Sequence, residues 1–113
     1  MKLKDIIEQL NLKALTAQEK CDVEASGGYT SDLLSDVIAN SKEKNVWVTL
    51  QTHPNIVAVA KLKDLAAIIL VNNRMPEAET LKKAEEEKVP LLTTGNSAFV
   101  ISGKLYALLG LKG

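Results

Sequence analysis

The chain has 113 residues, of which 46% are hydrophobic, 25% charged and 4% aromatic, a composition typical of one globular domain with an aliphatic core. Its 14 basic and 14 acidic side chains give a formal net charge of zero, and no basic cluster with interleaved aromatic residues occurs, which argues against nucleic-acid binding. One cysteine, Cys21, and one histidine exclude an internal disulfide and argue against a transition-metal site within a single chain.

The first half of the chain predicts helices and strands in alternation. Apolar residues at positions 3, 6, 7 and 10 recur at helical spacing and predict an amphipathic helix. Residues 21–25, CDVEA, alternate apolar and acidic side chains, as a strand with one exposed face does. After two glycines, the apolar stripe over residues 33–41 predicts a helix that Ser31 caps. Residues 45–51, NVWVTLQ, are rich in β-branched side chains and predict the next strand.

The second half repeats this alternation. Pro54 suits the first turn of a helix over residues 55–63, and AAIILV at 66–71 is apolar on both faces, like a central parallel strand. A helix is expected over 77–88, because acidic residues open it and Lys88 closes it in agreement with the helix dipole. VPLLTT at 89–94 predicts the last strand, and Ser97 caps a last helix that runs through Leu109.

Strands that alternate with helices predict the α/β fold class. We expect a single three-layer domain over residues 1–113, with a mostly parallel sheet flanked by helices. No apolar run reaches the length of a membrane span, and the first ten residues lack the features of a signal peptide. We therefore expect no membrane contact and a cytoplasmic location.

Polar residues gather in four loops that follow the predicted strands, at 26–28, 52–53, 72–74 and 94–97. Ligands of open α/β sheets bind beyond the carboxyl ends of the strands, so a ligand site is expected there. Loops are polar in every protein, and empty loops are the alternative. The candidate ligand-binding residues are Ser26, Gly27, Gly28, His53, Arg74 and Ser97.

The glycine pair has two interpretations, a cradle for a phosphate or a tight turn. No lysine or arginine lies between Cys21 and Ser41, and Asp32 near the start of the next helix would repel a phosphate. The spacing matches neither a P-loop nor the dinucleotide-binding glycine motif. A structural turn is therefore favoured.

Two side chains in the other loops suit ligand chemistry. Arg74, the only arginine, has the planar fork that binds carboxylate or phosphate, although a surface ion pair would also explain it. His53 could contact a ligand, act as an acid or base, or bond to the backbone of its own turn. No Ser–His–Asp or Cys–His arrangement follows from the spacing, so no catalytic residue, metal ligand or cofactor is predicted.

The last predicted helix is apolar around more than one face, so one sheet contact would leave a stripe uncovered. Thr49 and Gln51, alternating after Trp47, also indicate a face outside the ordinary core. We expect a homodimer, and deeper burial within the monomer is the alternative. The expected dimer contacts are Phe99, Leu105, Tyr106 and Leu109.

The stretches EASGGYTSDLLSDVIAN and QTHPNIVAVAKLKDLAAIILVNNRMPEAETLKKAEEEKVPLLTT resemble the DRTGG domain family, and the second also resembles the N-terminal domain of HPr kinase/phosphorylase. The motif Asp-Arg-Thr-Gly-Gly would fall on residues 24–28, where only the hydroxyl of Ser26 and the two glycines remain. In related proteins the domain is an accessory module joined to pyrophosphatase, phosphotransacetylase-like or kinase domains, and it tends to dimerise. The resemblance implies a regulatory or assembly role.

These observations predict a small non-catalytic regulatory or ligand-sensing module that binds a partner protein and an anionic metabolite or nucleotide. One alternative is a purely structural interaction protein without a small-molecule ligand. A second is an enzyme that uses His53 as an acid or base, for which one unpartnered histidine is thin support. ATP-dependent kinase activity is rejected, because the chain has no Gly-Lys-Ser or Gly-Lys-Thr loop.

Overall fold

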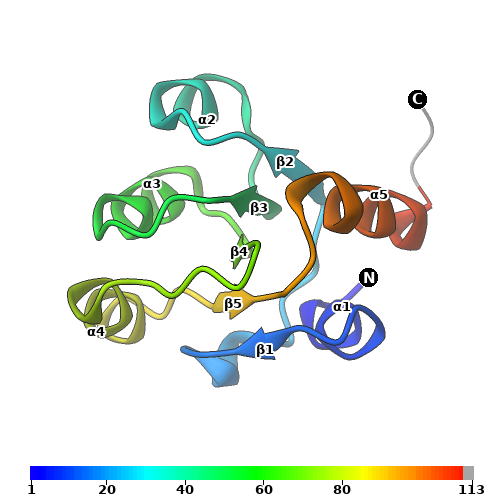
Figure 1. Ribbon diagram of the computed structural model, residues 1–113, viewed down its shortest axis with the longest axis horizontal. Helices are drawn as coiled ribbons and strands as arrows, with labels where there is room; N and C mark the ends of the chain where they lie inside the picture. The colour runs from blue at the N-terminus through cyan, green and yellow to red at the C-terminus, as the bar shows by residue number, and fades with distance from the viewer. Residues whose placement is uncertain (111–113) are drawn as a thin grey trace.

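The computed structural model describes residues 1–110, in which helices and strands alternate along the chain (Figure 1). The helices are Leu3–Gln9 (α1), Leu34–Asn40 (α2), Asn55–Lys63 (α3), Ala78–Glu86 (α4) and Ala98–Leu109 (α5), with a 3-10 turn at Gln18–Lys20 (η1). The strands are Lys13–Ala14 (β1), Gly27–Thr30 (β2), Asn45–Thr49 (β3), Ala67–Leu70 (β4) and Leu91–Thr93 (β5).

The five strands form one sheet in the order β1-β5-β4-β3-β2. Strands β2 to β5 are parallel and lie in chain order, and β1 pairs antiparallel with β5. Right-handed crossovers that always step in the same direction place their helices on one face of the sheet. Accordingly, α2, α3 and α4 cover one face, and α1 and α5 cover the other (Figure 1). The predicted three-layer α/β fold with a mostly parallel sheet is confirmed.

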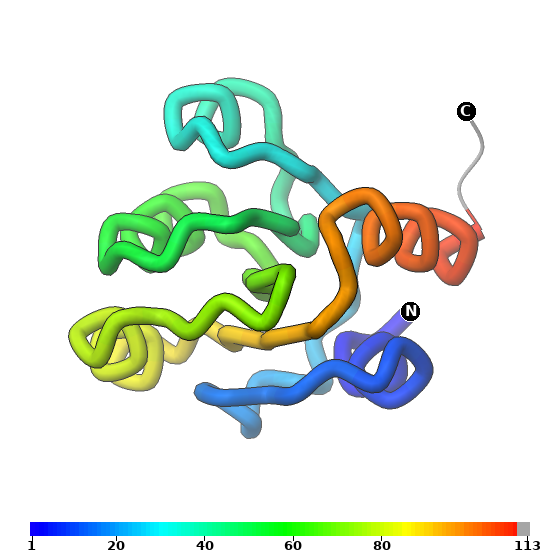
Figure 2. The backbone as a smooth tube through the Cα atoms, in the orientation of Figure 1, coloured from blue at the N-terminus to red at the C-terminus, as the bar shows by residue number. Residues whose placement is uncertain are grey.

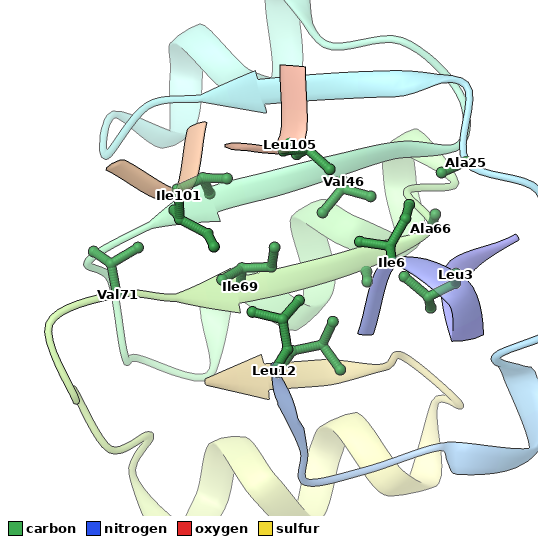
Figure 3. Close-up of a cluster of buried hydrophobic side chains, with 13 residues drawn as sticks. Leu3, Ile6, Leu12, Ala25, Val46, Ala66, Ile69, Val71, Ile101 and Leu105 are labelled. Carbon is green, nitrogen blue, oxygen red and sulfur yellow. The ribbon is translucent and has the colours of Figure 1, made fainter. Parts of the chain in front are cut away.

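The core has one cluster on each side of the sheet. Toward α1 and α5, buried side chains such as Ile6, Val46 and Ile101 pack together (Figure 3). Toward α2, α3 and α4, the second cluster contains Trp47 and Ile68. Each fully buried aliphatic side chain stabilises the fold by about 1.5–3 kcal/mol, so two such clusters hold the three layers together.

The exposed face expected beside Trp47 is absent, because all five residues of β3 are buried. The helices α2 and α3 cover that face, and the polar groups beneath them are paired. The Trp47 indole N–H donates to Ser31 O at 2.8 Å, and the Thr49 hydroxyl donates to Asp32 Oδ1 at 2.9 Å. The alternation of Thr49 and Gln51 after Trp47 therefore reflects polar side chains that are hydrogen-bonded within the fold, and it does not mark an exposed face.

The strand predicted at residues 21–25 is wrong. The carbonyl oxygens of Cys21 and Val23 accept from the N–H groups of Lys4 and Leu3, at 2.8 and 2.9 Å, so they satisfy the first turn of α1. Only Glu24 makes a sheet-like bridge in this segment. The side chains alternate because Cys21 and Val23 pack against the core cluster that includes α1.

The two predicted helix caps have different outcomes. Ser97 caps α5, since its Oγ accepts from the N–H of Val100 at 3.2 Å. Ser31 accepts from the N–H of Leu33 at 3.2 Å, one residue before α2 begins, and α2 has no side-chain cap. Ser31 thus closes the turn after β2, while the helix starts uncapped.

Within residues 1–110, no helix combines the length and the apolar character that crossing a bilayer requires.

Candidate functional site

The carboxyl ends of β2 to β5 meet at one edge of the sheet, where the chain divides between two faces. After β4 it runs to α4 on one face, and after β5 it turns onto the face that α1 also covers (Figure 2). In open α/β sheets, ligands bind in the crevice where neighbouring strands lead to opposite faces. The topology therefore places the candidate site at the ends of β4 and β5.

A cavity of about 310 Å³ opens at this point. It is lined by Leu10, Asn11, Thr94, Gly95, Asn96 and Lys104. Amide, hydroxyl and ammonium groups dominate this lining, and no carboxylate contributes to it. Lys104 is exposed and forms no ion pair within residues 1–110. A cavity with one free cation and several neutral hydrogen-bonding groups is suited to an anion. We call it the β5-edge cavity.

Backbone hydrogen bonds join the loop after β4 to the loop after β5, which lines the cavity. The N–H of Asn72 donates to Asn96 O and the N–H of Asn73 donates to Thr94 O, each at 2.9 Å. A Cβ on Gly95 would lie 3.2 Å from Asn73 Oδ1, so the missing side chain allows the loops to approach. Asn72 and Asn73 both have φ of 57°, a left-handed conformation that asparagine tolerates better than most residues. The cavity wall is thus fixed before a ligand arrives.

Asp32 closes the other end of the same sheet edge. Its Oδ1 accepts from the Thr49 hydroxyl at 2.9 Å and from the N–H of Leu50 at 2.7 Å, and Gln51 donates to its carbonyl oxygen at 2.8 Å. These bonds join the loops after β2 and β3. The Asp32 carboxylate therefore has structural partners of its own and does not line the β5-edge cavity.

Three of the six candidate ligand residues lie at this carboxyl edge, since His53, Arg74 and Ser97 follow β3, β4 and β5. Arg74 is exposed, has no ion pair within residues 1–110 and comes directly after Asn73, whose side chain lies beside Gly95 of the cavity lining. Ser97 is occupied by its cap bond. The His53 Nδ1 accepts from the N–H of Asn55 at 3.1 Å, so this histidine bonds to its own turn and leaves Nε2 free to donate.

His53 belongs to a different hollow from the β5-edge cavity. It lines a groove of about 310 Å³ between α3 and α4, together with Pro54, Val57, Lys61 and Lys83 among others. None of the six predicted ligand residues lines the β5-edge cavity.

The glycine loop does not lie where it was expected. Gly27 and Gly28 belong to β2 itself, and Gly27 is in register with Asn45, the first residue of β3. Ser26 donates its hydroxyl to Glu43 O at 2.6 Å at the same end. Ser26, Gly27 and Gly28 therefore lie at the amino end of the parallel strands, opposite the β5-edge cavity. The error followed from the wrong strand at 21–25.

Glycine is needed at position 28 because α5 packs directly over it. A Cβ on Gly28 would lie 2.9 Å from Leu105 Cδ2. The expected dimer contact Leu105 is thus wrong: it is only 3% exposed and belongs to the core of its own chain. Phe99, at 89% exposure, and Tyr106, at 45%, remain on the outside of α5, and Leu109 is half-buried.

Sequence reasoning named the loop at 94–97, which supplies Thr94, Gly95 and Asn96 to the β5-edge cavity, but missed Leu10, Asn11 and Lys104. Lys104 carried a usable signal, because it is the only charged residue in the otherwise apolar α5. Asn11 carried no signal in the sequence that could have identified it. It reaches the cavity because α1 ends beside the loop after β5, and Asn11 follows that end with a φ of 53°.

The Cys21 thiol and the possible metal ligands are the remaining groups that could carry chemistry. Cys21 is half-buried, and burial, followed by the charges of Asp22 and Glu19, raises the pKa of its thiol above the usual range. A thiol held protonated is a poor nucleophile and a poor metal ligand. Within residues 1–110, no three His, Cys, Asp or Glu side chains are placed to hold a metal ion.

No protein-family model and no curated protein matches the chain. Its fold is similar to the crystal structure of the CBS and DRTGG domains of the regulatory region of Clostridium perfringens pyrophosphatase, complexed with the activator diadenosine tetraphosphate. The TM-score is 0.71 at 15% sequence identity, and the likeness covers 92% of this chain and 45% of that chain. This chain therefore spans less than half the length of that neighbour. At this identity the likeness shows the fold, which is DRTGG-like, while the resemblance to HPr kinase/phosphorylase stays a prediction.

Proposed function

We propose that this chain is a non-catalytic regulatory module that senses an anionic, phosphate-bearing small molecule in the β5-edge cavity. The observation that carries the proposal is the lining of that cavity, with the free ammonium of Lys104 beside asparagine amides and no carboxylate. The N-terminus of α5 lies at the same sheet edge and adds a partial positive charge.

The structural neighbour supports a regulatory role, since its regulatory region is complexed with a dinucleotide that carries four phosphates. The exposed guanidinium of Arg74 follows Asn73, which lies beside Gly95 of the cavity lining, and it is the best second contact for a ligand too large for the cavity alone. The single cysteine, half-buried and without a disulfide, supports a cytoplasmic location.

The proposal includes self-association through α5. With Leu105 buried, the outer face of this helix presents Phe99, Gly103 and Tyr106, which are spaced by four and three residues. A large aromatic side chain that is 89% exposed on a short apolar face supports a contact with a second copy.

Titration calorimetry with ATP and with inorganic tripolyphosphate tests the ligand proposal. Replacing Lys104 by Met removes the one cation that residues 1–110 contribute to the cavity lining. We expect affinity to fall roughly tenfold to a hundredfold, which is the free energy of one hydrogen bond to a charged group expressed as a ratio of dissociation constants. Lys82→Gln, on the exposed face of α4, is the matched control and should bind like the wild type. If Lys104→Met and Lys82→Gln bind the ligand with equal affinity, the ligand binds outside the β5-edge cavity. If neither ATP nor tripolyphosphate gives a heat of binding to the wild type, a purely structural protein is favoured.

A further inference from the structure

The sheet ends at β2, an edge strand that is short but carries neither a charge nor a proline. The strand has four residues, Gly-Gly-Tyr-Thr, without a charge or a proline. Natural sheets protect exposed edges with lysine, proline, bulges or a covering segment, because free backbone groups pair with any available strand. Within residues 1–110, no strand pairs with the outer side of β2.

The pairing with β3 shows which backbone groups are free. The N–H of Ser31 donates to Val48 O at 3.2 Å, and bonds to one neighbour alternate along a parallel strand. Gly28 and Thr30 therefore turn their N–H and C=O groups outward. Both residues are exposed, in agreement with this alternation.

The Thr30 side chain and the Cα of Gly28 face α5, where the edge opens into a cavity of about 140 Å³. The cavity is lined by Gly28, Thr30, Ser102, Leu105, Tyr106 and Leu109. The hydroxyls of Thr30 and Ser102 lie 2.7 Å apart and satisfy each other. The lining is uncharged, and a cavity of about 150 Å³ is known to accept a group as large as benzene.

We propose that the free edge of β2 binds an extended segment of a partner protein, which adds a sixth strand to the sheet. In this mode of recognition, main-chain hydrogen bonds provide affinity and pockets for alternate side chains provide specificity. A residue opposite Gly28 would project toward α5, because side chains directly across a ladder lie on the same face. The recognised segment is therefore uncharged at that position and carries a branched aliphatic side chain, which fills the cavity beside Leu105, Tyr106 and Leu109.

A second copy of this chain is a poorer occupant of the edge. Pairing β2 with the β2 of another copy would bring glycine or threonine opposite Gly28, and the cavity would stay empty. Phe99, on the outside of α5, gives self-association a contact that the peptide cavity does not include, while Tyr106 borders both surfaces. The peptide site and the β5-edge cavity share no lining residue, so the inference does not rest on the proposed ligand.

Selection of random peptides of about seven residues, displayed on phage, against the whole chain tests the inference. We expect enriched sequences with Leu, Ile or Val at one fixed position. In amide NMR, the synthetic peptide should shift Gly28, Thr30 and Leu109. An aspartate at the fixed position should weaken binding by roughly tenfold or more.

Two matched comparisons, one between protein variants and one between modified peptides, distinguish main-chain pairing with β2 from binding through side chains alone. Thr30→Pro removes one outward N–H and should weaken peptide binding by roughly tenfold or more, while Thr30→Ala keeps the N–H and should stay within about threefold. If Thr30→Pro does not fold, the peptide supplies the same test. N-methylation of its amide that faces Gly28 should abolish binding, and N-methylation of the next amide, which faces outward, should not.

The inference is overturned if no sequence is enriched, if enriched peptides shift a different surface, or if N-methylation at the two positions has the same effect. It is also overturned if peptide binding halves the molecular mass of a self-associated form, because the edge would then be an interface between copies. Lys104→Met should leave peptide binding unchanged, which keeps this test separate from the calorimetric test of the anion site.

Discussion

The hydroxyl of Thr16 bridges segments that lie 73 residues apart in the chain. It donates to Val89 O at 2.7 Å and accepts from the N–H of Leu91 at 3.0 Å, and it is buried. This one side chain fixes the start of β5 against the segment after β1. Two buried main-chain groups therefore depend on a single oxygen atom.

We predict that Thr16→Val destabilises the protein by about 2–4 kcal/mol, because the isosteric change leaves a buried donor and a buried acceptor unpaired. Thr16→Ser keeps the hydroxyl and loses one methyl group, which should cost about 1 kcal/mol. Urea unfolding followed by circular dichroism measures both. A loss of stability in Thr16→Val that is no larger than the loss in Thr16→Ser would contradict the role assigned to the hydroxyl.

Gly95 is the residue through which loop geometry affects the β5-edge cavity. In Gly95→Ala the new methyl group would press on the exposed Asn73 side chain at 3.2 Å, which can move aside. We expect stability to change by less than about 1 kcal/mol, while affinity for tripolyphosphate falls several-fold because the cavity wall shifts. Unchanged affinity, measured by calorimetry, would exclude this wall from the ligand site.

At the scale of elements, β2 and α2 are connected through a carboxylate. Hydrogen bonds from Ser31, Asn40 and Tyr29, in that order of effect, hold the pKa of Asp36 below its ordinary value of 3.8. The Tyr29 hydroxyl donates to both carboxylate oxygens at 2.9 Å, and Asn40 donates at 2.9 Å. The ionised form of Asp36 is therefore favoured by folding.

Because the folded pKa of Asp36 lies below that of the unfolded chain, its contribution to stability is complete above the ordinary pKa of 3.8 and is lost as pH falls through the folded value. We predict that Asp36→Asn is less stable than the wild type near pH 7, and that the difference shrinks steadily below about pH 4. Urea midpoints over this pH range measure the effect. A difference that does not change with pH would show that the ionisation of Asp36 does not stabilise the fold.

The sequence predicted the elements whose signal is local. Helices α3, α4 and α5 and strands β3, β4 and β5 were found because periodicity, β-branched runs and caps are properties of a few neighbouring residues. The strand β1 was missed because two residues carry no pattern, and β2 was missed because glycines have low strand propensity. The false strand at 21–25 shows that packing against a helix can imitate strand alternation.

Part of the candidate site was predictable for the same reason. The loops at 72–74 and 94–97 follow correctly predicted strands, so their place at the carboxyl edge could be inferred from the chain. The cavity itself could not, because it forms where Asn11 and Lys104, on elements distant in sequence, approach the β5 loop. The burial of Leu105 likewise depends on how α5 crosses β2, which no local pattern records.

At the scale of the whole molecule, the exposed face of α5 predicts self-association. Phe99→Asp places a charge in the centre of the proposed contact without touching the core, so it should give a monomer by light scattering while the melting temperature changes little. Leu62→Asp, at an exposed leucine of α3, is the matched control and should leave the mass unchanged. A wild-type mass equal to one chain at micromolar concentration would contradict the proposed dimer.

The central claim is that the module binds a phosphate-bearing anion in the β5-edge cavity, and an amide NMR titration with ATP and inorganic tripolyphosphate tests it most directly. We predict saturable shifts at Asn11, Gly95, Asn96 and Lys104, with Arg74 following for the larger ligand. Thermal stabilisation should accompany them, by about 2.7 kcal/mol when the free ligand is at a hundredfold excess over its dissociation constant. Shifts confined to Gly27 and Gly28, or no shift at millimolar ligand, would contradict the claim.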